Sequence, residues 1–136
     1  MPKSDERSTQ IFAPIAIGEL IDKITILEIK SERISDQAKL GNVRNELSIL
    51  QDLRRTADLD TPDMAPFATE LKSLNVALWD IEDEIRKLEA RKDFGPRFIE
   101  LARSVYQTND QRARIKHRIN TAFGSHIVEE KSYKSA

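Results

Sequence analysis

A stretch in the middle of the chain carries apolar residues at alternating spacings of four and three. Its members are Phe67, Leu71, Leu74, Leu78, Ile81, Ile85 and Leu88. This spacing keeps side chains on one face of an α-helix, so it predicts one long helix with a continuous apolar seam. The seam needs a second helix to cover it. The chain, alone or as a homodimer, is therefore expected to form a helical bundle.

Length and charge limit the class of protein. The 136 residues suit one compact domain, and 22 basic against 23 acidic residues leave a net charge of -1. We therefore expect no overall field that favours nucleic acid or an acidic membrane. The chain has no cysteine, which excludes disulfides and thiolate metal sites. No apolar run approaches the roughly 20 residues of a membrane span, and the first ten residues lack the apolar core of a secretory signal, so we expect a cytoplasmic protein.

The order of segments predicts four helices in one domain. Residues 1–10 are polar and unpatterned and are expected to be disordered, so the domain spans residues 11–136. Residues 11–17 are apolar but contain Pro14, which favours an extended lead-in packed on the domain. Gly18 marks the boundary. Residues 19–33 then carry apolar side chains almost all round a helix, because Ile26 and Ile29 widen the stripe, and this helix should be central. A strand over residues 23–30 is the alternative.

Turn and capping residues set the limits of the remaining helices. Ser35 or Asp36 can cap a second helix that fades near Ala57. Turn-rich residues 58–66 separate it from the long third helix, which ends near residue 92. Pro96 and Gly124 punctuate a fourth helix over residues 96–123. The predicted fold is all-α: an antiparallel helical bundle of about four helices with an extended N-terminal lead-in and a short C-terminal tail.

One cation falls on the apolar stripe of the fourth helix. The expected buried positions are Leu101, Val105, Thr108, Arg112, Ile115 and Ile119, and a guanidinium there is costly unless it is paired. Antiparallel packing places Arg112 roughly opposite Leu74 and Asn75. Two interpretations follow: a structural ion-pair network, or an anion pocket formed by Arg103, Arg112 and Lys116.

A second, mixed stripe runs beside the seam of the third helix. It consists of Asn75, Trp79, Glu82, Arg86 and Glu89. The spacing of Glu82 and Arg86 supports a helix by itself, but Asn75 and Trp79 are not explained that way. Trp79 suits a core or interface anchor, or less often a platform for a ligand.

Acidic pairs at three-residue spacing raise the possibility of a metal site. Glu19 and Asp22 open the first helix, and Asp80 and Asp83 lie on the third. Facing carboxylate pairs can hold magnesium in helical pyrophosphohydrolases. Acids in the first turn of a helix also stabilise its dipole, so we expect no metal and no cofactor.

Three segments together resemble a family of small uncharacterised bacterial proteins, a domain of unknown function. They are GELIDKITILEIK near the start, LARSVYQTND in the fourth helix and EEKSY in the tail. The resemblance implies no catalytic roles, and it suggests a link to surface-polysaccharide metabolism. The positions that carry it are Glu19, Asp22, Lys23, Glu28, Lys30, Asn75, Trp79, Glu82, Arg86, Arg103, Tyr106, Asn109, Asp110, Arg112, Lys116, Glu129 and Lys131.

These observations favour a helical module that binds a protein partner or a small anionic ligand through a polar groove. The alternative is a small all-helical enzyme acting on an anionic substrate, similar to a chorismate mutase or to a metal-dependent nucleotide pyrophosphohydrolase. A homodimer is expected because the first and third helices offer more apolar surface than a small monomer covers. The candidate ligand-binding residues are Lys23, Lys30, Asn75, Trp79, Glu82, Arg86, Arg103, Tyr106, Asn109, Arg112 and Lys116.

Overall fold

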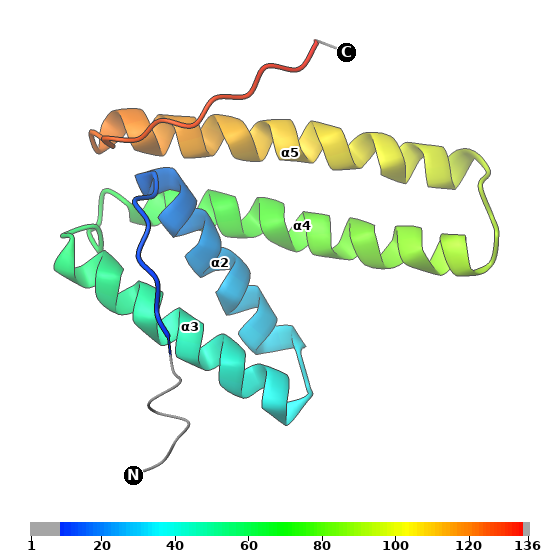
Figure 1. Cartoon of the computed structure of the whole chain (residues 1–136). Coiled ribbons are helices and arrows are strands. Elements are labelled where there is room, and N and C mark those ends of the chain that lie inside the picture. The colour runs from blue at the N-terminus through cyan, green and yellow to red at the C-terminus, as the bar shows by residue number, and fades with distance from the viewer. Residues whose placement is uncertain (1–8, 135–136) are drawn as a thin grey trace.

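A computed structural model describes residues 9–134 as an all-α fold (Figure 1). Its helices are α2 (Ile17–Arg33), α3 (Gln37–Thr56), α4 (Ala65–Ala90) and α5 (Pro96–Ala122). The predicted fold class is confirmed, and the alternative strand over residues 23–30 is wrong because that segment is continuous helix. The predicted disordered tail falls almost entirely on residues 1–8, which lie outside the described residues. No helix in the described part of the chain is long and apolar enough to cross a membrane.

Helix α2 is the central element, as its nearly all-round apolar surface predicts. The backbone of α2 lies next to α3 on one side and next to both α4 and α5 on the other (Figure 1). Helix α3 lies next to neither α4 nor α5. Helices α4 and α5 form a long antiparallel hairpin. The main core lies where α2 meets this hairpin and consists of Leu20, Ile21, Ile24, Leu59, Met64, Leu71, Ile115 and Ile119.

The far half of the α4–α5 hairpin extends beyond α2 (Figure 1). The predicted seam of α4 is covered unevenly along both halves of the hairpin: Leu71 and Leu88 are buried, whereas the other seam positions are half-buried. Near the hairpin turn, Phe94 and Ile99 are 49% and 56% exposed. The Arg97 guanidinium donates two hydrogen bonds of 2.9 Å to the Glu84 carboxylate, and these bonds lower the pKa of Glu84.

The lead-in is extended, as predicted, but most of it is not packed on the bundle. Ile11 and Phe12 are each 86% exposed, so the expectation of a packed lead-in is wrong for these residues. Burial begins at Ala16, where the chain enters α2. The Ile17 N–H, at the start of α2, donates to Ser125 Oγ at 3.0 Å. Packing starts there because this end of the lead-in meets the turn that follows α5.

Candidate functional site

The N-terminus of α2 meets the last turns of α5 at very close range. A Cβ added to Gly18 would lie 2.5 Å from the carbonyl oxygen of Lys116, so only glycine allows this approach. The Gly18 N–H donates to Asn120 Oδ1 at 2.7 Å. A helix start has unpaired N–H groups, and Asn120 satisfies one of them from a neighbouring helix. This contact fixes the position of the first turn of α2, and hence of its acidic residues, against α5.

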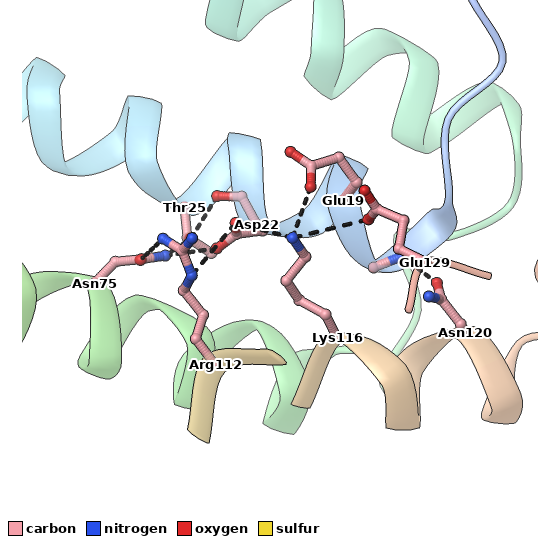
Figure 2. A network of polar contacts seen from close by, with 9 residues as sticks. Glu19, Asp22, Thr25, Asn75, Arg112, Lys116, Asn120 and Glu129 are labelled. Atoms are coloured by element: carbon pink, nitrogen blue, oxygen red, sulfur yellow. Dashed lines mark hydrogen bonds and ion pairs between the residues drawn. The ribbon is translucent and has the colours of Figure 1, made fainter. Parts of the chain in front are cut away.

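Asp22 is the buried centre of a polar network that joins α2, α4 and α5 (Figure 2). Its carboxylate accepts a hydrogen bond of 2.8 Å from Asn75 Nδ2, and its side chain is only 3% exposed. Two cations of α5 reach the same carboxylate, with Lys116 Nζ at 3.7 Å and Arg112 Nε at 3.9 Å from Asp22 Oδ2. A buried carboxylate needs such partners because its desolvation is costly.

Asn75 connects Asp22 to Arg112. Its amide nitrogen donates to Asp22 and also to Thr25 Oγ1 at 3.0 Å, and its amide oxygen accepts from Arg112 Nη1 at 3.1 Å. The Thr25 hydroxyl in turn donates to the carbonyl oxygen of Asp22. The packing opposite Asn75 that the sequence predicts for Arg112 is confirmed. Every hydrogen-bonding atom of the Asn75 side chain therefore has a partner, which fixes the direction of the guanidinium.

Lys116 is surrounded by carboxylates from two segments. Its ammonium lies 2.6 Å from Glu19 and 3.8 Å from Glu129, in addition to Asp22 (Figure 2). Glu129 belongs to the C-terminal segment, which returns beside α5 and is held there by an ion pair of 2.7 Å between Lys131 and Asp110. Within the described residues, no buried side-chain nitrogen or oxygen lacks a hydrogen-bond partner. These contacts support the interpretation of Arg112 as part of a structural ion-pair network.

A groove of about 960 Å³ lies between α5 and the C-terminal segment. Arg112 and Lys116 line it together with Tyr106 and Asn109 of the same helix. Its charged lining consists of five cations, namely Arg112, Arg114, Lys116, Lys131 and Lys134, and three carboxylates, namely Asp110, Glu129 and Glu130. The lining therefore has a formal charge of +2, from five cations and three carboxylates. Two of these cations, Lys116 and Arg112, also pair with Glu19 and Asp22 of α2, which do not line the groove.

A smaller notch of about 260 Å³ opens on the other side of Arg112. Its lining comes mainly from α2 and α4 and consists of Ile26, Ile29, Asn75, Leu78, Trp79, Glu82, Asp83 and Arg112. The Arg33 guanidinium lies 5.8 Å from the centroid of the Trp79 ring. Arg112 is the one residue that lines both cavities.

The predicted site residues do not lie together in one groove. Those that line a cavity are divided between the groove and the notch. Tyr106, Asn109, Arg112 and Lys116 line the groove, whereas Asn75, Trp79, Glu82 and Arg112 line the notch. The other candidates, Lys23, Lys30, Arg86 and Arg103, line neither cavity. Arg86 instead pairs with Glu82 along the helix surface, and Arg103 is exposed.

Several residues of the groove were not predicted as ligand-binding residues. Glu130, Tyr133 and Lys134 lie on the returning C-terminal segment. The apolar pair Ile127 and Val128 is the feature of the sequence from which docking of this segment on the bundle can be predicted. The lining residues Glu129 and Lys131 were noted for the family resemblance, not for a role in a site.

The two acidic pairs do not come together as a metal site. Asp22 and Glu19 are engaged by Asn75 and Lys116, and Asp80 pairs with Arg33 at 2.6 Å. Among residues 9–134, no group of three histidine or acidic side chains is placed to hold a metal ion.

Comparison with known proteins places the chain in a family. No curated protein and no solved structure matches it. The family model that does match covers residues 12–136, which includes the groove, the notch and the network between them. The chain therefore belongs to the family of unknown function DUF6165.

Proposed function

We propose that the protein is a helical module that binds a small anionic ligand in the groove between α5 and the C-terminal segment. The observation that carries this proposal is the placement of Arg112 and Lys116. Both cations line the groove, and both are held by buried partners on α2 and α4. A preorganised guanidinium binds carboxylate or phosphate oxygens in two-point geometry at little entropic cost.

A bound anion would take the place that Glu129 occupies beside Lys116. The ion pair of Glu129 is long, at 3.8 Å, and the Glu129 side chain is 53% exposed, whereas Glu19 holds the same ammonium at 2.6 Å. The exposed pair is the weaker one because water screens it. Tyr106 and Asn109 supply further hydrogen-bonding groups along the same wall.

The expected result is a rise in melting temperature with phosphate, sulfate or a dicarboxylate, compared with sodium chloride at equal ionic strength. A ligand at ten times its Kd adds about 1.4 kcal/mol to the free energy of unfolding, which corresponds to roughly 3–6 °C for a chain of this size. The rise should vanish in Arg112→Met and shrink in Lys116→Ala. Differential scanning fluorimetry measures all three proteins.

Arg103→Met is the matched control, because Arg103 is an exposed arginine on the same helix that lines neither cavity. It should respond to anions as the wild type does. Equal responses in the wild type, Arg112→Met and Lys116→Ala would overturn the anion site and leave Arg112 with its structural role alone.

The resemblance supplies the first ligands to test. A link to surface-polysaccharide metabolism would make sugar phosphates and uronic acids the relevant anions, and both present the oxygens that a guanidinium binds. We place this binding in the cytoplasm. An enzyme that acts on an anionic substrate in the same groove is the alternative, and turnover of such a sugar rather than simple binding would favour it.

We also propose that two copies associate through the far half of the α4–α5 hairpin. In one chain this half lacks cover from α2, and it exposes Phe94 and Ile99. A twofold interface would bring the same exposed apolar side chains of the two copies into contact. Exposed apolar surface beside alternating charges suits such an isologous contact.

Sedimentation at micromolar concentration should show a dimer for the wild type and a monomer for Ile99→Glu, because the substitution places two like charges in the interface. Ile49→Glu, on α3, is the control, since Ile49 is also exposed and lies away from the hairpin. A wild type that sediments as a monomer would refute the dimer.

A further inference from the structure

The notch beside Trp79 has an apolar wall that neither the fold nor the proposed function accounts for. Ile26 and Leu78 are half-buried, although they lie on helices that pack against each other. Trp79, the single tryptophan of the chain, is half-buried beside them. These side chains face a cavity of about 260 Å³ instead of closing on one another.

Part of the lining of the notch is polar and preorganised. Arg112 and Asn75 line it, and Asn75 is 5% exposed and fully hydrogen-bonded to its neighbours. The Arg112 side chain keeps 28% of its surface exposed. Asn75 takes one of the five N–H donors of the guanidinium, and the contact to Asp22 is an ion pair at 3.9 Å. Donors of a fixed guanidinium therefore remain for a ligand.

We infer that the notch binds a small amphipathic carboxylic acid. The carboxylate would bind Arg112, and the apolar part would pack against Ile26, Leu78 and the Trp79 ring. Ligand sites typically combine mostly apolar walls with a few convergent polar groups. The volume lies just below the usual range of about 300–1,000 Å³, which suits a molecule with a single ring.

The charges around the notch restrict the ligand to one negative group. Glu82 and Asp83 line the notch with Arg112, and both are exposed. The Arg33 guanidinium beside the Trp79 ring does not offset them, because it is already paired with Asp80 at 2.6 Å. A second anionic group near them would be repelled, so phosphate esters and dicarboxylates are disfavoured here although they suit the groove. The inference shares Arg112 with the proposed function but does not rest on it, because it concerns a different cavity and a different ligand class. Ile26 lines the notch and not the groove, so a change at Ile26 tests the notch alone.

Trp79 provides a direct readout. Titration with cyclohexanecarboxylate, which is nearly transparent where tryptophan is excited, should change the Trp79 emission saturably. The uncharged analogue cyclohexanecarboxamide has the same ring and nearly the same shape. It should bind at least tenfold more weakly, because it lacks the charge that Arg112 recognises.

Two variants locate the binding. Ile26→Glu places a negative charge in the apolar wall, and Arg112→Met removes the cation, so each should abolish the saturable change. Ile49→Glu is the matched control: it introduces the same residue at an exposed isoleucine of α3, outside the notch, and should titrate like the wild type. Far-UV circular dichroism verifies that each variant is folded.

No saturable change in the wild type would overturn the inference. Equal binding of the acid and the amide would also overturn it, since the guanidinium would then play no part. Full retention of the titration in a folded Ile26→Glu protein would show that the acid binds elsewhere.

Discussion

Replacing Asp22 with alanine is expected to lower the free energy of unfolding by about 3–5 kcal/mol, the range for removing one partner of a buried ion pair. The carboxylate is 3% exposed and holds Asn75, Lys116 and Arg112 together. Its loss leaves an amide N–H without an acceptor and two cations facing each other with less negative charge between them. Urea denaturation followed by circular dichroism measures the change.

Asp22→Asn should fall between the wild type and Asp22→Ala, because an amide oxygen can still accept from Asn75 but carries no charge. Asp80→Ala is the surface control: Asp80 pairs with Arg33 at 2.6 Å but is 62% exposed. Its removal should cost no more than about 1 kcal/mol. A similar small loss for Asp22→Ala would show that the network does not connect the helices energetically.

Leu71→Ala is the second large effect, expected at about 2–5 kcal/mol, the range for truncating a buried leucine. Leu71 is fully buried in the main core between α2, α4 and α5. Truncation removes packing contacts and leaves a cavity that the surrounding helices fill only in part. The same urea denaturation measures it.

Leu78→Ala is the matched comparison, because Leu78 occupies the same seam two turns further along α4. Leu78 is half-buried and lines the notch, so its truncation loses less transfer free energy than truncation of a fully buried leucine. The truncation also leaves no closed cavity. We expect a loss clearly smaller than that of Leu71→Ala. Equal losses at the two positions would mean that the notch is filled in solution.

The four helices could be predicted from the sequence because their signals are local. The spacing of apolar residues gave each helix its face, and Asp36 and Pro96 marked two of the starts. The uneven burial of α4 could not be predicted in this way. A seam specifies that a partner is needed, but not how closely the partner packs at each position.

The centre of the site was partly visible in the sequence. Periodicity placed Arg112 on an apolar stripe and opposite Asn75, and the structure joins these two side chains. The same reasoning could not find the contact of Asn120 with Gly18, nor the return of Glu129 to Lys116. Both depend on where two distant segments meet, which no repeat or spacing in the chain encodes.

The sequence predicted one groove, whereas the structure divides the predicted residues of the described chain between a groove and a notch. The mixed stripe of α4 and the cations of α5 were assumed to face a common space. Instead, Asp22 and Asn75 fill the middle, and the guanidinium of Arg112 lies between a wide polar groove and a small apolar notch. Lys23 and Arg103 have no place in either cavity because their helical positions face solvent.

A phosphate titration of the ¹⁵N-labelled protein, followed by two-dimensional NMR, tests the anion site most directly. The predicted result is saturable shifts concentrated on α5 near Asn109, Arg112 and Lys116 and on the C-terminal segment around Glu129, with α3 unaffected. Release of Glu129 from Lys116 should make the C-terminal shifts among the largest. Shifts spread evenly over the basic residues of all four helices, or no saturable shifts at all, would contradict an anion site in the groove.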